Sequence, residues 1–399
     1  MNQVNCPVCG MKCVKSGKTK AGSQRWLCKN CKTSLTHKIN NESKELQIFL
    51  DWLFGKESQS TMSGEGRSFR RKTAKFWDIW AMPPKIAETR DVVFLDGIYL
   101  SRKACVLICC DEKHVLGWYL CRYEHAGAWI ALMKRIAEPR MVVSDGGTGF
   151  AKALKKAWPK AKHQRCVFHV FCQVKRYITS RPNTAAGAEL YMLVKDLLKI
   201  KSKKESQIWV ERFINWIKKY QDFLDEMTID ENGKSRPTHE RILKAERSLL
   251  KLLKEKTLFT YLDENLKNDF STPSTNNRIE GGINSRLREM LRNHRGLSIE
   301  RRIKAVYWWC YMHSPEPLPL SEIIKVMPTE QSITSIYQRM NEKNRLEKSL
   351  SIWGDAIVWS DLHNVDYIYH VYIMTYRSIR GSIELAYANP MLYNSVSLG

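Results

Sequence analysis

The sequence predicts a multidomain α+β protein. Its 399 residues are too many for one ordinary domain. Cysteines crowd the first 31 residues, helical periodicity follows as far as residue 80, and runs of β-branched and aromatic residues begin after Pro83 and Pro84. Each of these changes in residue pattern marks an expected domain boundary. The expected segments are 1–40, 41–82, 88–185, 186–268, 269–314 and 315–399.

The charge of the chain indicates a polyanionic partner. Lysine and arginine number 65 against 41 aspartates and glutamates, and the formal net charge of +24 is spread along the whole chain. The first residues do not form a signal peptide, and the longest apolar runs are shorter than the roughly 20 residues of a membrane span. Without a secretory signal, the twelve cysteines favour thiols and metal sites over disulfides. We therefore expect a cytoplasmic, nucleoid-associated protein that binds nucleic acid and no membrane.

The first segment carries two Cys-x-x-Cys pairs that are separated by 18 residues. This spacing lets four thiolates surround one zinc ion, and a turn over 15–18 followed by a strand-like run over 24–27 completes the pattern of a zinc ribbon. A segment this short folds only with its metal, so we expect a structural Zn²⁺ rather than a catalytic one. The expected ligands are Cys6, Cys9, Cys28 and Cys31. Cys13 or His37 remains an alternative ligand.

The second segment predicts a helix-turn-helix. Residues 43–54 place their apolar side chains on one helical face, and Ser68 is positioned to cap a second helix over 69–80. The aromatic residues of the second helix would pack it onto the protein, which leaves its basic side chains for a groove or for phosphates. The candidate DNA-binding residues here are Arg70, Arg71, Lys72 and Lys75. The alternative is a solvated basic helix that reads no bases.

The third segment predicts a sheet in which two aspartates converge. The expected order of elements is β-β-β-α-β-α-β-α, the order of a ribonuclease H-like α/β core, in which the first and fourth strands are neighbours. Asp96 lies within the first strand and Asp145 closes the fourth, where a carboxylate is costly to desolvate unless it is paired or binds a cation. The alternative is two turn aspartates, each followed by glycine. The expected strands are 92–100, 104–110, 114–121, 141–144 and 164–168.

A third carboxylate is needed to hold two divalent cations about 3.5 to 4 Å apart for phosphodiester chemistry. The sequence 276–291 has apolar residues at helical spacing, and Glu280 lies at the rim of the buried stripe. Asn276 and Asn284 lie four residues to either side, on the face of Glu280, where they could orient its carboxylate or contact DNA. The adjacent glycines that follow Glu280 are unusual in a helix and indicate close approach of another group. Glu289 is the rival carboxylate.

Together these motifs resemble the bacterial insertion-sequence transposases of the Mutator-like group, in the variant with an amino-terminal zinc-binding segment. The resemblance covers residues 5–310, and its most specific element is the Cys-x-x-His motif of Cys166 and His169. It implies a DDE triad that binds Mg²⁺ or Mn²⁺, cuts DNA at terminal inverted repeats and joins the freed 3′ ends to a target. The implied triad is Asp96, Asp145 and Glu280.

The resemblance also implies a helical insertion, 186–268, between the fifth strand and the glutamate helix. Cys166 and His169 lack two ligands for a zinc site of their own, so we expect a supporting role for them. The expected active-site supports are Cys166, His169, Asn276, Asn277 and Asn284. The arginines expected to hold DNA phosphates are Arg278, Arg286, Arg288 and Arg292.

The resemblance leads us to expect double-stranded DNA as the partner and a homo-oligomer assembled on it. Two alternatives stay open. One is a zinc-dependent DNA-binding regulator whose nuclease fold is inactive, and the other is a nuclease of the same fold that cuts without joining. Residues 315–399 contain no pattern that indicates chemistry.

Overall fold

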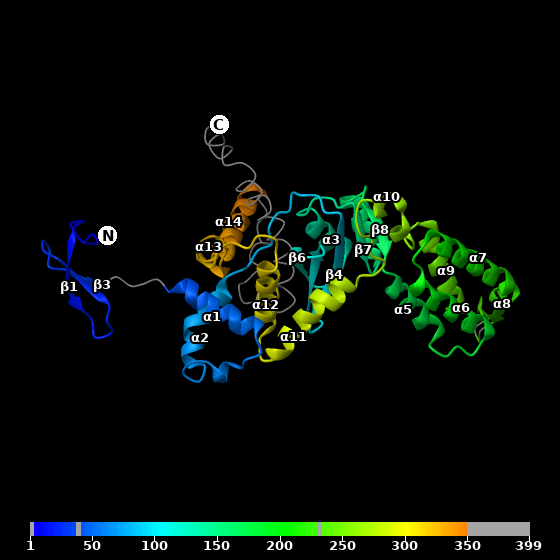
Figure 1. Ribbon diagram of the computed structural model, residues 1–399, viewed down its shortest axis with the longest axis horizontal. Helices are drawn as coiled ribbons and strands as arrows, with labels where there is room; N and C mark the ends of the chain where they lie inside the picture. Colours follow the sequence, from blue (N-terminus) through cyan, green and yellow to red (C-terminus); the bar gives the residue numbers. More distant parts are fainter. Residues whose placement is uncertain (1–3, 37–40, 230, 232, 349–399) are drawn as a thin grey trace, which may run out of the picture.

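The computed structural model describes residues 4–36, 41–229, 231 and 233–348. These residues form a three-stranded, a five-stranded and a two-stranded sheet together with many helices, so the expected α+β class is confirmed (Figure 1). Across the same ranges, none of the helices combines the length and the apolar character that a membrane span requires. Residues 349–399 of the last expected segment lie outside the described residues.

The amino-terminal sheet has three antiparallel strands in chain order. They are β1 (Cys13–Lys18), β2 (Gln24–Cys28) and β3 (Ser34–Thr36). Its interior is a cluster of cysteines and a few apolar side chains, separate from the main core. The turn expected over 15–18 is wrong, because these residues extend β1 and the chain reverses over 19–22. Gly17 is the residue that indicated a turn. Its φ of +74° instead accommodates an irregularity within the pairing of β1 and β2.

Short helices follow the amino-terminal sheet. They are α1 (Glu42–Phe54), the 3₁₀ turn η1 (Gln59–Thr61), α2 (Arg67–Thr73) and the 3₁₀ turn η2 (Ala74–Asp78). The first helix agrees with the prediction, but the second does not run over 69–80 and is not capped by Ser68. Gly66, with φ +77°, precedes it, and a Cβ on Gly66 would lie 2.3 Å from the Gln59 carbonyl oxygen, so this tight turn fixes where α2 begins. Four aromatic side chains are buried as expected, namely Phe69, Phe76, Trp77 and Trp80.

The five-stranded sheet has the order β6-β5-β4-β7-β8. Its strands are β4 (Val92–Leu100), β5 (Ala104–Cys110), β6 (Val115–Cys121), β7 (Met141–Ser144) and β8 (Lys162–Arg165). The first three strands pair antiparallel, whereas β4, β7 and β8 are parallel. The predicted adjacency of the first and fourth strands is therefore present. The fifth strand ends at Arg165 instead of residue 168, because the apolar Val167 and Phe168 already belong to the next helix.

Helices cover both faces of this sheet. On one face pack α3 (Ala126–Met133) and, beside it, α4 (Thr148–Ala157), and on the other packs α12 (Ile299–Met312). Two neighbouring residues of β6 show the division, since successive side chains of a strand point to opposite faces. Gly117 faces Leu132 of α3, whereas the Trp118 ring meets the Tyr307 ring of α12 edge to face at 6.1 Å.

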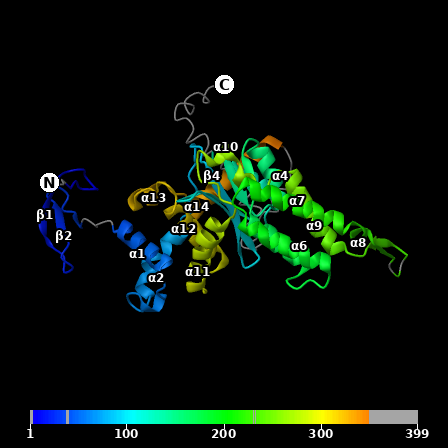
Figure 2. The same cartoon turned by 45° about the vertical axis from the view of Figure 1, so that its right-hand side comes forward.

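A helical lobe lies between the fifth strand and the helix of Glu280 (Figure 2). Its elements are α5 (Val167–Ile178), α6 (Ala185–Asp196), η3 (Leu197–Lys199), α7 (Lys203–Lys219), α8 (Gln221–Asp225), β9 (Met227–Ile229), β10 (Ser235–Pro237), α9 (Glu240–Lys254), η4 (Thr260–Leu262) and α10 (Glu264–Lys267). The two ends of the lobe meet beside the sheet. The Val167 amide donates to the Ser274 carbonyl (3.0 Å), and the Asn276 amide donates to the Cys166 sulfur (3.2 Å).

The remaining helices pack beside the sheet and α1. They are the π-helix η5 (Arg278–Asn284), α11 (Ser285–Asn293), α13 (Leu320–Val326) and α14 (Glu330–Lys348). Lys304 of α12 is 1% exposed, and its ammonium donates to the carboxylates of Glu300 (2.6 Å) and Glu330 (2.8 Å). The indole of Trp80 also donates to Glu330 (2.7 Å). This charge network, in which Lys304 is buried and both carboxylates are partly exposed, connects the start of α14 to the segment that follows α2.

Candidate active site

The parallel pairing of β4 and β7 brings the two aspartates together. Leu95 of β4 is in register with Ser144, the last residue of β7, so Asp96 and Asp145 follow at the same level. Asp96 lies within a strand whose neighbours are buried, and Asp145 lies in the turn beyond β7, where its carboxylate accepts the Gly147 amide at 3.3 Å. The turn residues and the β-branched runs of the sequence predict the order of the strands. This order predicts that the two aspartates lie on neighbouring strands.

Glu280 approaches these aspartates from a π-helix. The sequence predicts a regular helix over 276–291, but residues 278–284 form a π-helix and α-helical geometry begins only at Ser285. The close approach that the paired glycines indicated comes from Asn277, whose Oδ1 would lie 2.5 Å from a Cβ on Gly281. π-Helical segments are rare and are frequent at functional sites.

Two fully buried asparagines connect the π-helix to β4. The Asn284 Nδ2 donates to the Asp96 Oδ2 at 2.7 Å, and the Asn276 Nδ2 donates to the Leu95 carbonyl at 3.1 Å. Among the described residues, the Oδ1 atoms of both asparagines and the Oε1 atom of Glu280 are buried without a hydrogen-bond partner. Buried oxygens normally have a partner, and oxygen donors of this kind are the ligands that Mg²⁺ prefers.

The carboxylates affect one another electrostatically. Burial, and then the charge of Asp145, raise the pKa of Asp96 to about 6. Burial, and then the charges of Asp96 and Asp145, raise the pKa of Glu280 to about 7. Because like charges at this range favour protonation, a divalent cation that neutralised them would reverse both shifts.

Cys166 and His169 lie directly behind Glu280. Cys166 is buried between β8 and α5, and the His169 Nδ1 is 3.3 Å from the Glu280 Oε1 but not in hydrogen-bond geometry. One ligand atom from each of Cys166, His169 and Glu280 falls within 4.8 Å of the others, so the three could also hold a metal ion that accepts sulfur and nitrogen. Burial lowers the pKa of His169, which keeps its imidazole neutral near pH 7.

The arginines around the site are exposed. Arg278, Arg286, Arg288 and Arg292 all present solvent-accessible side chains on the π-helix and α11. Arg288 lies near enough to oppose the raised pKa values of Asp96 and Glu280. Glu289, the rival carboxylate, instead forms an exposed ion pair with Lys56 at 3.1 Å.

The basic residues of α2 and η2 are not alike. Arg70, Arg71 and Lys72 are exposed. Lys75, in contrast, forms ion pairs with Glu42 (3.2 Å) and Glu45 (3.0 Å) of α1. A role of Lys75 in binding phosphates would therefore compete with two carboxylates that already neutralise it.

Two residues of the site were missed in the sequence. Glu124 follows β6, and burial, then the charges of Asp145 and Asp96, raise its pKa to about 7. Arg165 ends β8, and its side chain lies over Gly146, where a Cβ would be 2.4 Å from it. Burial lowers the pKa of Arg165, and the nearby Asp145 opposes that shift. Glu124, like Asp145, is a carboxylate shortly beyond a buried strand, and this pattern in the sequence indicates it as a site residue.

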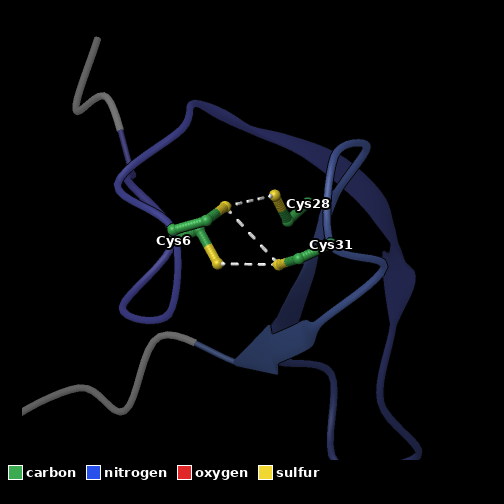
Figure 3. A group of neighbouring side chains, drawn as sticks. Cys6, Cys28 and Cys31 are labelled. Carbon is green, nitrogen blue, oxygen red and sulfur yellow. Dashed lines mark hydrogen bonds between the residues drawn. The ribbon is translucent and has the colours of Figure 1, made fainter.

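The amino-terminal cysteines form a second, separate site (Figure 3). Sulfur–sulfur distances are 3.4 Å for Cys6 and Cys31, and 3.5 Å from Cys9 to both Cys28 and Cys31. Four thiolates that each bind zinc at about 2.3 Å in a tetrahedron stand about 3.8 Å apart, so this four-cysteine group fits a structural zinc ion. The Thr33 hydroxyl, 3.1 Å away, lowers the pKa of Cys31 to about 6 and so favours its thiolate.

The alternative zinc ligands receive no support from this geometry. Cys13 is buried in the same cluster but lies outside the four-cysteine group, and burial raises its pKa. His37 lies outside the described residues.

A mixed α+β protein with a carboxylate centre is the class that this fold and site define. Residues 96–233 match the family described as "Transposase, Mutator family", a segment that contains Asp96, Asp145 and the Cys-x-x-His motif but not Glu280. The resemblance inferred from the motifs is confirmed by this match, which covers residues 96–233.

Two curated relatives agree with this family. The chain is 24% identical over 208 residues to the transposase for insertion sequence element IS905 of Lactococcus lactis subsp. lactis, which covers 48% of the chain and 51% of that protein. It is 28% identical over 172 residues to the transposase for insertion sequence element IS6120 of Mycolicibacterium smegmatis, which covers 38% of the chain and 52% of that protein. The chain thus spans about half the length of these relatives.

Proposed function

We propose that the protein is a DDE transposase that cuts double-stranded DNA at the terminal inverted repeats of an insertion sequence and joins the freed 3′ ends to a target. The observation that carries the proposal is the convergence of Asp96, Asp145 and Glu280, each from a different element, beside buried oxygens that lack partners. The family match supports the transposase activity.

The strand order supports a ribonuclease H-like core. Three antiparallel strands are followed by two parallel ones, and the first strand lies at the centre of the sheet next to the fourth. In this arrangement the sheet holds two aspartates rigidly, while a helix from later in the chain supplies the glutamate. The helical lobe includes most of the expected insertion 186–268. It lies between the aspartates and the glutamate in sequence but does not separate them in space.

The donor set fits two Mg²⁺ or Mn²⁺ ions held by Asp96, Asp145 and Glu280. Bound there, such ions would activate the attacking oxygen and stabilise the leaving oxygen of a phosphodiester. The chain's own groups prepare the site: Asn284 orients the Asp96 carboxylate through its Oδ2, and Asn276 fixes the start of the π-helix on β4. His169, neutral and behind Glu280, restricts the position of that carboxylate.

The exposed basic side chains are proposed to hold the DNA backbone. Those next to the carboxylates are Arg278, Arg286, Arg288 and Arg292, and those of α2 are Arg70, Arg71 and Lys72. We include α1 and α2 in a helix-turn-helix, and the zinc ribbon in recognition of the transposon ends. Because two ends have to be processed together, we extend the proposal to a homo-oligomer assembled on DNA in the nucleoid.

A cleavage assay tests the triad. Purified full-length protein is incubated with Mg²⁺ and a duplex that carries the terminal repeats of its own element. Asp96→Asn, Asp145→Asn and Glu280→Gln should each abolish cutting. Glu289→Gln is the matched control, because it removes a carboxylate nine residues further along the same helical stretch and should cut normally.

The products separate the alternatives. If Glu280→Gln cuts normally while Glu289→Gln does not, the assignment of the third carboxylate is wrong. Cleavage without joined products would identify a nuclease that does not transpose. Binding of the repeats without cleavage in any metal would identify a regulator.

A further inference from the structure

Cys166 and His169 place two metal-binding side chains at the start of α5, behind Glu280. Cys166 is the N-cap residue of α5, and His169 follows three residues later in the first helical turn, so the two side chains are neighbours on the helix surface. One ligand atom from each of Cys166, His169 and Glu280 lies within 4.8 Å of the other two. The Cys-x-x-His motif alone supplies two ligands, and the fold brings a third to it.

The His169 Nδ1 and the Glu280 Oε1 lie close together without a hydrogen bond. They are 3.3 Å apart, both atoms are buried, and neither has a hydrogen-bond partner among the described residues. Buried polar atoms normally have a partner, and a cation bound by both atoms would satisfy them together. Two ligands that each bind zinc at about 2.0 to 2.1 Å in a tetrahedron stand about 3.3 to 3.4 Å apart. The observed separation therefore fits two ligands of one zinc ion.

Backbone hydrogen bonds hold the Cys166 sulfur in place. The Cys166 amide donates to the Ser144 carbonyl (2.9 Å) at the end of β7, and the Asn276 amide donates to the sulfur itself (3.2 Å). A hydrogen bond to the sulfur favours the thiolate, which is the form that binds a metal, and such outer partners orient metal ligands in proteins. Because Asn276 directly precedes the segment that carries Glu280, the fold joins the two parts of this group without a metal.

The donor atoms of this group differ from those of the aspartates. Sulfur, imidazole nitrogen and a single carboxylate oxygen suit Zn²⁺, whereas Mg²⁺ prefers oxygen ligands alone. Three protein ligands with water as the fourth form a known coordination of zinc in proteins. A carboxylate has two oxygens, so use of the Glu280 Oε1 here leaves the other oxygen for the proposed catalytic cations.

We propose that Cys166, His169 and Glu280 bind a second zinc ion, with a water molecule as its fourth ligand. The ion binds the thiolate of Cys166, the Nδ1 of His169 and the Oε1 of Glu280. This inference goes beyond the proposed function, because the site needs neither the two aspartates nor DNA.

The zinc content of the full-length protein tests the proposal. Protein equilibrated with buffered Zn²⁺ should contain two zinc ions per chain, as counted by plasma mass spectrometry. Cys166→Ser, which keeps a good N-cap for α5, should contain one, and so should Cys28→Ser, which removes a ligand of the amino-terminal site. The double variant should contain none. Cys172→Ser is the matched control on the same helix and should contain two, because Cys172 belongs to neither group.

Cobalt identifies the ligands of the second ion. Co²⁺ is added to protein that retains the zinc of its amino-terminal site, and the absorption band that a thiolate gives when it binds Co²⁺ is recorded. Cys166→Ser should abolish this band and Cys172→Ser should retain it. His169→Asn and Glu280→Gln should keep the thiolate but weaken Co²⁺ binding by about tenfold or more. Thermal unfolding checks that each variant is folded.

The outcomes separate this inference from the proposed function. If the wild type contains one zinc ion and gives no thiolate band with Co²⁺, the second zinc site is refuted, while the loss of DNA cutting in Glu280→Gln would still support the catalytic triad. If the second zinc depends on Cys166 but Glu280→Gln cuts DNA normally, the zinc site stands and the triad is refuted. An equal loss of zinc in Cys172→Ser would attribute the second ion to unspecific thiol binding and would refute the site.

Discussion

The cysteine site and the carboxylate site are built in opposite ways. The cysteine ligands come from a short stretch in which Cys6 and Cys31 are 25 residues apart, and they lie in a small cluster apart from the main core. The carboxylate site joins Asn284 to Asp96 across 188 residues, and a sheet whose strands β5 and β6 are fully buried supports it. In our proposal, the first site needs its zinc ion in order to fold, whereas the second needs the fold in order to bind its cations.

Removal of zinc should give the largest difference between the two sites. A chelator, or Cys28→Ser, should unfold residues 4–36 and leave the five-stranded sheet intact, because apparent binding free energies of structural zinc are about 10 kcal/mol or more and a ribbon has little other core. Zinc content and limited proteolysis measure this. Cys13→Ser is the control and should retain zinc. Loss of the sheet together with the ribbon would contradict the independence of the two regions.

Substitution of Asn284 should have an intermediate effect. Asn284→Ala removes the amide that orients Asp96 but keeps all three proposed ligands, so cutting should fall by about 10- to 100-fold while the fold persists. Cleavage rates over a series of Mg²⁺ concentrations measure it. Asn293→Ala, at the end of α11, is the control. A rate equal to that of wild type would mean that the strand alone positions Asp96.

The pH dependence of stability should show the smallest effect. The folded pKa of Asp96 is about 6, raised by burial and then by Asp145, whereas the unfolded value is near 3.8. Between these values the folded state binds more protons, so the contribution of Asp96 to the free energy of unfolding falls as pH rises and stays low above about pH 6.

Asp96→Asn should therefore stabilise the protein without added Mg²⁺ at pH 8, by about 1–3 kcal/mol, and should have a smaller effect, about a third as large, at pH 4.5. Denaturant unfolding at the two pH values measures this difference. A gain of the same size at both values would attribute it to packing instead of charge.

The features that local sequence patterns determine were predicted. The features that depend on contacts between distant or neighbouring side chains in the folded chain were not. Strand order, the four cysteines and the two aspartates follow from spacing and from turn residues. The π-helix was not predictable, because Ile279 and Ile283 keep a stripe that an α-helix would also show, and the close approach of the Asn277 side chain to Gly281 exists only in the folded chain. The close approach of the Glu124 carboxylate to Gly97, where a Cβ would lie 2.5 Å from its Oε1, was not predictable because it exists only in the folded chain.

The place where the helical lobe leaves and rejoins the sheet has a consequence for how such proteins diversify. Val167 and Ser274 are hydrogen-bonded to each other, as are Asn276 and Cys166, so the chain departs and returns at one point. Residues 257–261 also bond to β8, so insertions or deletions between residues 179 and 251 change the length of a segment whose ends stay fixed. The lobe can therefore change in length while the carboxylates keep their register.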